Sequence, residues 1–530
     1  MDLPALATEI TQTSGIWAPT IRYRGDTFYV TTTLVDDAKN TSDTSRWDNV
    51  IFTTGNPYDS SSWSDPTHFD FDGYDPGLFW DDDGQAYVVG AHPWQIRPGI
   101  DLAPLNLETG EIGKQETVWN GTGGVAPEGP RAFKKDGYYY LVIAEGGTYL
   151  DHMATIARSK TPMGPYEPNP ANPFLTNANT TEYFQAVGHA DLFPDANGNW
   201  WGVALAMRAD LINFAVPMGR ETVLYPIRWT SEGWPVASQV RGVMSGWSLP
   251  APIPSPIPNK ASVSAPDIVD FPPGSAIPAH FIHQRFPDND SYVVSPTGHE
   301  NTLRLTPSTQ NLTGQSGIVP PKGPTFLARR QTDTLFSFSA VFDFQAKQPG
   351  EEIGVTLYVS QDDHVDLGLV LISDETTNAT SSSLKPYFRL RGQSEVTNIE
   401  ETLVAVPDEW SQRSTRMQIK SINGTHYAFS AAPSQHQSQE QTIAYISASS
   451  LRTTFTGEEK TWTPRSTSLL TERQVHWSGY ILLPTGEMEA HQFTSVNGDT
   501  MARDNFATRS HTWRLHNCVE YNLETVSSCE

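Results

Sequence analysis

The second half of the chain shows the clearest alternation of hydrophobic and polar positions. Hydrophobic side chains occupy every second position in three successive segments: 336–344, 353–359 and 365–371. Each segment has turn residues at its ends. An alternation with a period of two is typical of half-buried antiparallel strands. Several such strands in succession predict a β-sandwich. No segment of the chain has the period of a convincing amphipathic helix.

The first half of the chain contains a hairpin pattern that recurs four times. Each copy has a short apolar strand, a turn that contains glycine, and a second strand rich in aromatic and β-branched residues. A repeat with several strands per unit is typical of a β-propeller, in which the innermost strand of every blade runs along the central axis. The turn glycines, spaced by 59, 53 and 61 residues, are Gly25, Gly84, Gly137 and Gly198.

Three ionisable residues share one offset in this repeat. Asp75, Glu128 and His189 each lie nine positions before the turn glycine of their copy, and the copy that begins at Ala18 has no such residue. We therefore expect the three side chains to occupy one structural position and to converge at one mouth of the channel. A single residue of this kind is equally well explained as a turn residue. Opposed carboxylates around an open channel form a candidate acid and base pair for cleaving a glycosidic bond.

The length of the chain and its proline content predict the domain boundaries. A chain of 530 residues is too long for one ordinary hydrophobic core, so at least two domains are expected. Between the two patterns, the sequences APIPSPIPNK and DFPPGSAIP follow neither period. We predict an all-β protein with a propeller domain at 1–248, a proline-rich linker at 249–279 and a β-sandwich domain at 280–530.

The charge balance excludes two classes of partner. The 60 acidic residues outnumber the 35 basic ones, which gives a formal net charge of -25. Nucleic acids and anionic membranes attract clustered Lys and Arg, so neither is expected to bind. No apolar run approaches the roughly 18 to 20 residues that span a bilayer.

Several features predict an extracellular glycoprotein. Seven Asn-x-Ser/Thr sequons indicate passage through a secretory pathway. The two cysteines, Cys518 and Cys529, are either a disulfide in an oxidising compartment or two separate thiols. The N-terminal sequence MDLPALATEI has neither the basic nor the apolar region of a signal peptide. Secretion is therefore expected of a full-length form.

Five motifs follow one another along the first half of the chain: SGIWAPTIRY (Ser14 to Tyr23), YDPGLFWDDDG (Tyr74 to Gly84), PEGPRAFKKDGYYYLVIAEGGT (Pro127 to Thr148), GHADL (Gly188 to Leu192) and GRETVLYPIRW (Gly219 to Trp229). In this order they resemble glycoside hydrolase family 43. The segment GEEIGVTLYVSQDDHVDLGL further resembles the accessory sandwich of fungal β-xylosidase and α-L-arabinofuranosidase-like members. The resemblance covers nearly the whole chain. It implies a five-bladed propeller with a concanavalin-like β-sandwich, and hydrolysis with inversion at the anomeric carbon.

The resemblance also implies a role for each candidate site residue. Glu128 matches the general acid, and Asp75 matches the carboxylate that orients this acid and raises its pKa, as a nearby negative charge does. Arg220 matches the arginine that holds sugar hydroxyls, and Trp17 resembles a tryptophan of the sugar pocket. His189 matches a channel histidine near which some relatives hold calcium through water. No cofactor is required.

Each binding residue also has an ordinary structural interpretation. Trp17 is alternatively part of the propeller core. Arg220 and Glu221 are alternatively a surface ion pair of little energetic value. His189 is alternatively a neutral, hydrogen-bonded core histidine. The sequence leaves both interpretations open for all three residues.

The chain departs from the family at its N-terminus. An inverting mechanism needs a second carboxylate, roughly 6.5 to 9.5 Å from the acid, to activate water. The resemblance places this base in an Asp-Pro-Ser motif on the first blade, but only sixteen residues precede Trp17, and Asp2 and Glu9 lie in no such motif. We therefore expect an N-terminally incomplete propeller that lacks its first blade and begins at an internal methionine.

Three functions of different classes remain. The leading hypothesis is an enzyme that cleaves terminal β-xylosyl, or secondly α-L-arabinofuranosyl, bonds in plant hemicellulose, with xylo- or arabino-oligosaccharides as substrates. The second is a catalytically impaired carbohydrate-binding propeller, since the base is missing. The third is a structural or adhesion protein that binds through its sandwich. The matched pair of Glu128 and Asp75 favours the enzyme, because a lectin needs no acid with a carboxylate partner.

Overall fold

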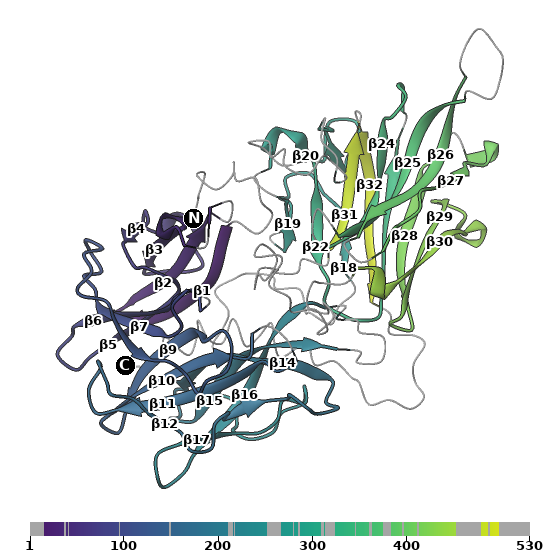
Figure 1. The fold of residues 1–530 in the computed structure, drawn as a ribbon. Coiled ribbons are helices and arrows are strands. Elements are labelled where there is room, and N and C mark those ends of the chain that lie inside the picture. The colour runs from purple at the N-terminus through teal and green to yellow at the C-terminus, as the bar shows by residue number, and fades with distance from the viewer. Residues whose placement is uncertain are drawn as a thin grey trace.

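The computed structural model consists of a propeller lobe and a sandwich lobe (Figure 1). It describes residues 15–36, 39–40, 42–94, 96–147, 150–209, 216, 218–251, 267–278, 280–284, 287–308, 312, 324–344, 346–359, 363–374, 383–394, 397–410, 413–451, 479–485 and 488–497. Within these residues, no helix is long and apolar enough to cross a membrane.

Four antiparallel sheets form the propeller lobe, and the first four strands of each follow one another in chain order (Figure 1). The first strand of each sheet contacts the first strand of the next, so β1, β5, β9 and β14 lie innermost. The first two sheets contain β1 (Gly15–Arg24), β2 (Thr27–Val35), β3 (Trp47–Thr54) and β4 (Thr67–Phe69), then β5 (Tyr74–Trp80), β6 (Ala86–Ala91), β7 (Ile100–Pro104) and β8 (Glu116–Trp119). The other two contain β9 (Glu128–Lys135), β10 (Tyr138–Glu145), β11 (Met153–Ser159), β12 (Glu167–Pro168) and β13 (Leu175–Thr176), then β14 (Phe184–Pro194), β15 (Trp200–Arg208), β16 (Arg220–Trp229) and β17 (Pro235–Ala237).

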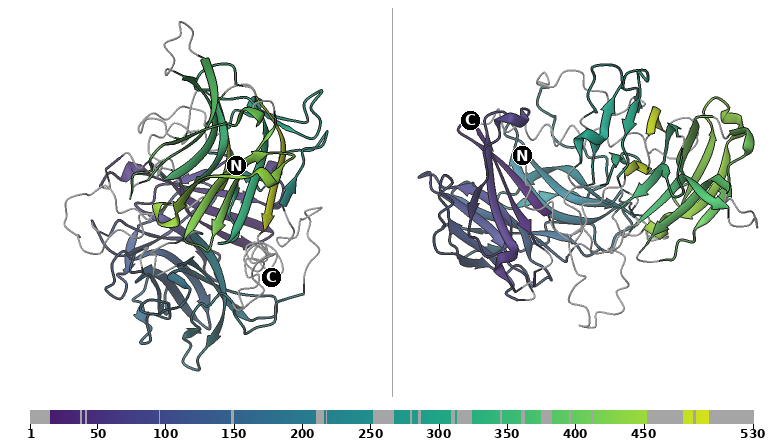
Figure 2. Two further views of the ribbon diagram at one scale, coloured as in Figure 1. Left: turned by 90° about the vertical axis from the view of Figure 1, so that its right-hand side faces the viewer. Right: turned by 90° about the horizontal axis from the view of Figure 1, so that it is seen from above.

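Two larger antiparallel sheets form the sandwich lobe, which lies beside the propeller in Figure 1 and in the right-hand view of Figure 2. The eight-stranded sheet contains β18 (Asp267–Val269), β20 (Tyr292–Val294), β21 (Leu303–Leu305), β23 (Phe336–Asp343), β28 (Thr415–Ile422), β29 (His426–Pro433), β30 (Gln441–Ser447) and β32 (Met488–Asn497). The seven-stranded sheet contains β19 (Phe281–Ile282), β22 (Leu327–Arg330), β24 (Glu352–Tyr358), β25 (His364–Asp374), β26 (Ser383–Gln393), β27 (Thr402–Ala405) and β31 (Gly479–Thr485).

The helices of the described residues are short 3-10 turns in the loops. They are η2 (Thr44–Arg46), η3 (Ser60–Ser62), η4 (Asn289–Ser291), η5 (Asp408–Trp410), η6 (Gln437–Gln439) and η7 (Ala448–Leu451).

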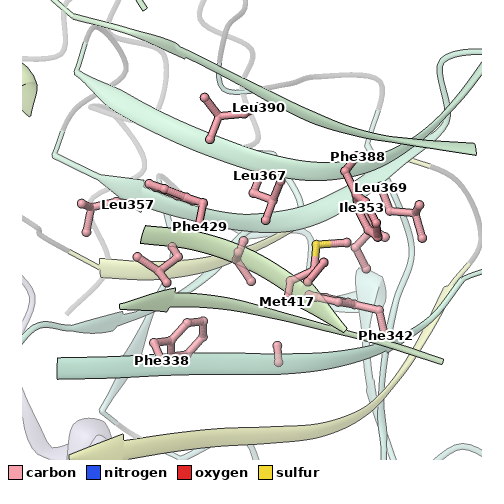
Figure 3. Packing of buried hydrophobic residues seen from close by; sticks show 14 of the residues in the cluster. Phe338, Phe342, Ile353, Leu357, Leu367, Leu369, Phe388, Leu390, Met417 and Phe429 are labelled. Atoms are coloured by element: carbon pink, nitrogen blue, oxygen red, sulfur yellow. The ribbon is translucent and has the colours of Figure 1, made fainter. Parts of the chain in front are cut away.

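The alternation in the sequence becomes the core between the two sandwich sheets. Every second residue of β23, β24 and β25 points inward, as Phe338, Ile353 and Leu367 do in Figure 3. Phe388 and Phe429 enter the same core from β26 and β29. These side chains are almost fully buried, and burying a large apolar side chain contributes roughly 1.5–3 kcal/mol. The hydrophobic effect therefore holds the two sheets together.

The predicted fold class, an all-β propeller followed by a β-sandwich, is confirmed. The predicted domain boundaries at 248 and 280 stay predictions. Much of the proline-rich linker, 252–266 and residue 279, lies outside the described residues, as do Cys518 and Cys529. One contact between the lobes is buried: Gln331 Nε2 donates a hydrogen bond to Met218 Sδ at 3.3 Å.

Candidate active site

The four innermost strands share one irregularity, a β-bulge. In each of β1, β5, β9 and β14, two adjacent residues oppose a single residue of the partner strand. The first residue of each pair has a positive φ, a left-handed conformation that bends the strand and re-aims its side chains. These residues are Ala18 (φ 34°), Asp75 (57°), Gly129 (56°) and His189 (49°), and β14 has a second bulge that begins at Ala186 (53°).

The bulges correct the expected equivalence of the three ionisable residues. Asp75 and His189 are bulged residues, but Glu128 lies one position before its bulge, opposite Ala144. The reason is the turn: two residues link β9 to β10, whereas five link β5 to β6 and β14 to β15. The turn glycine therefore does not mark a constant position on the strand. The residues equivalent to Glu128 are Trp17, Tyr74 and Gly188.

Gly129, which follows Glu128, brings the three predicted residues together. Its backbone N–H donates a hydrogen bond to Asp75 Oδ2 at 3.0 Å. On its other side lies the His189 ring, so close that a Cβ atom at Gly129 would stand 2.5 Å from His189 Nε2. Asp75 and Glu128 are only 4% and 2% exposed. Two buried carboxyl groups and a histidine, from three blades, thus meet around one peptide where the innermost strands begin.

An aromatic cluster adjoins Glu128. The Trp17 ring lies edge-on to the rings of Trp47 and Tyr74, with centroids 5.9 Å apart in both cases. Trp47 and Tyr74 stack at 5.3 Å, and the Tyr74 hydroxyl donates a long hydrogen bond of 3.5 Å to Glu128 Oε2. Trp17 is partly buried and packs against the propeller core. Its role in a sugar pocket stays a prediction, for which the cluster supplies the apolar surface.

Polar contacts link the innermost strands in a closed series, from the first blade to the fourth and back to the first. Because each contact joins residues far apart in sequence, the series fixes how the blades stand around the axis. The contacts are Thr20 Oγ1 to Pro76 O (2.9 Å), Gly129 N to Asp75 Oδ2 (3.0 Å), Arg131 Nη2 to His189 Nε2 (3.5 Å) and Arg22 Nη1 to Asp191 Oδ2 (2.6 Å).

Desolvation keeps the histidines near the axis neutral. Burial, and then the charge of Arg131, hold the pKa of His189 well below its ordinary value. His152, in the loop between β10 and β11, is fully buried, and burial lowers its pKa to about 4. Burial also lowers the pKa of Arg131, although the carboxylates of Asp191 and Asp75 oppose this effect. The axis therefore holds cations and neutral imidazoles close to the two buried carboxyl groups.

Arg220 begins β16 at the same end of the propeller. Its positive charge contributes to the lowered pKa of both His152 and His189, so it lies within electrostatic reach of the axis. Its neighbour Glu221 forms an ion pair with Arg208, with 2.7 Å between Oε1 and Nη2 and both side chains 12% exposed. Burial raises the pKa of Glu221, and the Arg208 charge opposes that increase. The predicted role of Arg220 toward sugar hydroxyls stays a prediction.

The calcium ion predicted near His189 also stays a prediction. Within the described residues, no group of three or more His, Cys, Asp or Glu side chains is placed to hold a metal. Calcium prefers six to eight oxygen ligands, whereas the groups that act electrostatically on His189 are Arg131, His152 and Arg220. These residues do not fit direct coordination, so such an ion would have to bind through water.

The sequence patterns missed several residues around the site. Glu145 is fully buried and accepts hydrogen bonds from the Thr122 and Gly124 amides, both at 2.9 Å, which holds the loop that leads into Glu128. Arg131 and His152 were also missed. One signal could have found the true register, because the second residue of three of the five bulges is proline: Pro19, Pro76 and Pro130.

Both lobes match known protein families. The sequence profile described as glycosyl hydrolases family 43 matches residues 4–235. The profile described as the beta xylosidase C-terminal concanavalin A-like domain matches residues 269–464.

Among curated proteins, the chain is 33% identical over 359 residues to a non-reducing end alpha-L-arabinofuranosidase, BoGH43B, of Bacteroides ovatus. That alignment covers 67% of this chain and 62% of the relative. The chain is 32% identical to a xylosidase/arabinosidase of Butyrivibrio fibrisolvens, with 68% of each chain covered.

Solved structures align with this chain over most of both lobes. A structure described as Bacteroides ovatus xyloglucan PUL GH43B aligns with a TM-score of 0.74 and 25% identity, over 93% of this chain and 88% of the other. A xylan beta-1,4-xylosidase from Bacillus halodurans C-125 aligns with a TM-score of 0.74 over 91% and 87% of the two chains, and its 23% identity supports the fold alone.

Proposed function

Because the chain belongs to glycosyl hydrolases family 43, we propose that it is a glycoside hydrolase that releases terminal β-xylosyl or α-L-arabinofuranosyl residues with inversion. Its substrates would be xylo- or arabino-oligosaccharides of plant hemicellulose. The printed names of the relatives, an arabinofuranosidase and a xylosidase/arabinosidase, support this substrate class. The chain spans 62% of the first of these relatives.

The observation that carries the proposal is the hydrogen bond between Gly129 N and Asp75 Oδ2 at 3.0 Å. It ties the Asp75 carboxylate to the peptide that follows Glu128, so the two carboxyl groups keep a fixed relation although 53 positions separate them. In the proposed mechanism, Glu128 donates its proton to the departing glycosidic oxygen. The nearby negative charge of Asp75 helps to retain that proton near neutral pH. The Trp17 and Tyr74 rings would pack against the sugar.

Inversion also needs a base that takes a proton from the attacking water. Glu145 is a poor candidate, since hydrogen bonds from Thr122, Gly124 and Thr155 already occupy both its oxygens. Asp2 and Glu9 lie outside the described residues. A carbohydrate-binding propeller without turnover is therefore the alternative outcome of the test below.

We further propose that the protein is an exported glycoprotein. Five of the sequon asparagines lie within the described residues, and every one of them is exposed, as attachment of a glycan requires: Asn40, Asn120, Asn179, Asn289 and Asn423. Expression in a eukaryotic secretory host followed by glycosidase treatment tests this. An unchanged mass after treatment would refute it.

The central test uses aryl β-D-xyloside and aryl α-L-arabinofuranoside with the 530-residue chain. Proton NMR during the first minutes should show release of the pentose in the inverted anomeric form. Asp75→Asn should lower the rate and move the basic limb of the pH–rate profile to lower pH, because the charge that retains the acid's proton is gone. Pentose binding without any hydrolysis would establish the non-catalytic alternative. Retention of configuration would refute the proposed mechanism.

A further inference from the structure

His152 is a fully buried histidine to which the proposed mechanism assigns no role. It lies in the loop between β10 and β11 of the third blade, 0% exposed. β10 ends, and β14 and β16 begin, at the end of the propeller where β9 brings in Glu128. The loop therefore places His152 at the mouth that holds the two carboxyl groups.

The His152 ring takes the place of a side chain that the fourth blade lacks. The position just before the bulge carries Trp17, Tyr74 and Glu128 in the first three blades, but Gly188 in the fourth. A Cβ atom at Gly188 would stand 2.6 Å from both Cδ2 and Nε2 of His152. The imidazole thus occupies the position where the other three blades present the aromatic rings and the acid.

The hydrogen bonding of His152 leaves one nitrogen as a bare acceptor. Nδ1 lies 2.9 Å from the Ala186 carbonyl oxygen, and because a carbonyl only accepts, Nδ1 carries the hydrogen. In the neutral ring, Nε2 then has a free lone pair. Nε2 is buried and has no hydrogen-bond partner within the part of the chain that the structure describes. A buried acceptor of this kind is unfavourable and calls for a donor.

Arg220 is the donor that the surroundings supply. It begins β16 opposite Met207 of β15, and Met207 lies opposite Gln185, the residue before Ala186, whose carbonyl holds the His152 ring. The Arg220 charge also acts on His152 and on His189. A guanidinium group has five N–H donors, so it can give one to a histidine and still hold sugar hydroxyls with others. We propose that His152 is a positioning residue: with sugar bound, its Nε2 accepts an N–H from Arg220 and aims the guanidinium at the sugar hydroxyl groups. This inference rests on the proposed function, in which Arg220 binds the substrate.

Three substitutions separate this role from a merely structural one. His152→Gln places an amide oxygen near the position of Nε2 and keeps the acceptor. His152→Asn places its amide near Nδ1, so it keeps the bond to Ala186 but loses the acceptor. His152→Phe keeps the ring and loses both. The readouts are KM and kcat on the aryl pentosides, the dissociation constants of D-xylose and L-arabinose by calorimetry, and the melting temperature.

We expect His152→Phe and His152→Asn to raise KM and the dissociation constants about tenfold, the value of one hydrogen bond to a charged group. His152→Gln should restore most of that loss, and kcat should change less than KM. In an Arg220→Met background, His152→Phe should change binding by less than about twofold, since the group that it positions is gone.

Three results would overturn the inference while leaving the proposed function intact: binding preserved by Asn but not by Gln, unchanged KM in His152→Phe, or the full loss repeated in the Arg220→Met background. If the wild-type chain binds pentoses without hydrolysing them, the proposed function fails and the dissociation constants still decide the inference. A wild-type chain that neither hydrolyses nor binds pentoses would overturn both.

Discussion

The innermost strands of the propeller and the seven-stranded sheet of the sandwich are built differently. All four innermost strands carry a bulge with a left-handed residue, which is Asp75 in the second blade and His189 in the fourth. The pairings of the seven-stranded sheet show no register shift along its described strands. A left-handed residue other than glycine costs of order 1–3 kcal/mol and persists only where the surroundings impose it.

The partners of the buried carboxylates also differ between the two regions. In the regular sheet, Glu352 is paired with the guanidinium groups of Arg389 and Arg391, and Asp366 lies 2.9 Å from His364 Nδ1. At the bulges, Asp75 instead accepts a backbone N–H from the neighbouring blade. In this sheet the buried carboxylates Glu352 and Asp366 pair with side chains of regular strands. Asp75 instead lies on a strained bulge and is held by a backbone amide of the next blade. This contrast agrees with chemistry at the propeller axis and a supporting role for the sheet.

The largest expected effect comes from the acid itself. Glu128→Gln should lower the hydrolysis of substrates with poor leaving groups about 10²- to 10⁴-fold, because an amide cannot donate the leaving-group proton. The loss should be much smaller for aryl glycosides with good leaving groups. Steady-state kinetics on a series of aryl xylosides measures both values. An equal loss across the series would argue against Glu128 as the acid.

The same kind of substitution in the sandwich should lower stability and leave catalysis unchanged. Glu352→Gln removes the buried carboxylate that is ion-paired with both Arg389 and Arg391, so the free energy of unfolding should fall by about 3–5 kcal/mol. The kcat of the folded fraction should not change. Denaturant unfolding gives the free energy of unfolding of Glu128→Gln and of Glu352→Gln, and steady-state kinetics give the kcat of the folded fraction of each. The two measurements together test the contrast. A large change in kcat from Glu352→Gln would show that the sandwich contributes to chemistry.

The sandwich could be predicted from its sequence more fully than the propeller site. The alternating segments 336–344, 353–359 and 365–371 correspond to β23, β24 and β25 within three residues at each end, because regular strands keep the period of two throughout. The hairpins of the blades were also visible. The shared position of Asp75, Glu128 and His189 was wrong by one residue for Glu128, because a bulge is defined by the partner strand and turn lengths differ between blades.

The contacts at the axis could not be predicted from the sequence for a similar reason. His152 meets Gly188, and Asp75 meets Gly129, only after three blades have assembled around the axis. No local pattern records such an encounter. Aligning the copies on Pro19, Pro76 and Pro130 would have located the bulges, but it would not have shown which side chain fills the space above a glycine.

The two regions should also differ in their response to acid. His152 is neutral in the folded protein, with a pKa of about 4, and has an ordinary value near 6.5 when unfolded. Between these values the unfolded chain binds a proton that the folded chain does not. The contribution of His152 to the free energy of unfolding is therefore fully present above about pH 6.5. It is lost as the pH drops toward 4, which lowers the free energy of unfolding by up to about 3 kcal/mol. His189, whose pKa is also lowered, acts in the same direction.

In the sandwich, Asp366 has a lowered pKa, because His364, Thr356 and Arg391 together outweigh the opposing effect of burial. Its contribution is present above its unfolded pKa, which is near 4, and is lost only at lower pH. Melting temperatures measured from pH 7 to pH 4 should therefore decrease, and His152→Gln should flatten the decrease. An identical slope for the variant and the wild type would show that His152 is not the group that takes up the proton.

The smallest expected effect concerns two glycines, one at the propeller axis and one in the sandwich. Gly188→Ala would place a Cβ atom 2.6 Å from the His152 ring, so the imidazole must shift. Overpacking of this kind costs about 1–3 kcal/mol of stability, and a displaced His152 would no longer position Arg220, so pentose binding should weaken as well.

Gly350→Ala is the matched control from the sandwich: the glycine has a φ of +85° and nothing within 4 Å of its added Cβ. The control should cost about 1–2 kcal/mol through backbone strain alone and leave binding unchanged. Thermal unfolding and calorimetric titration of both variants measure the two effects. If Gly188→Ala left binding unchanged, the close packing of His152 on the fourth blade would be structural only, and the contrast between the axis and the sandwich would then rest on the carboxyl groups.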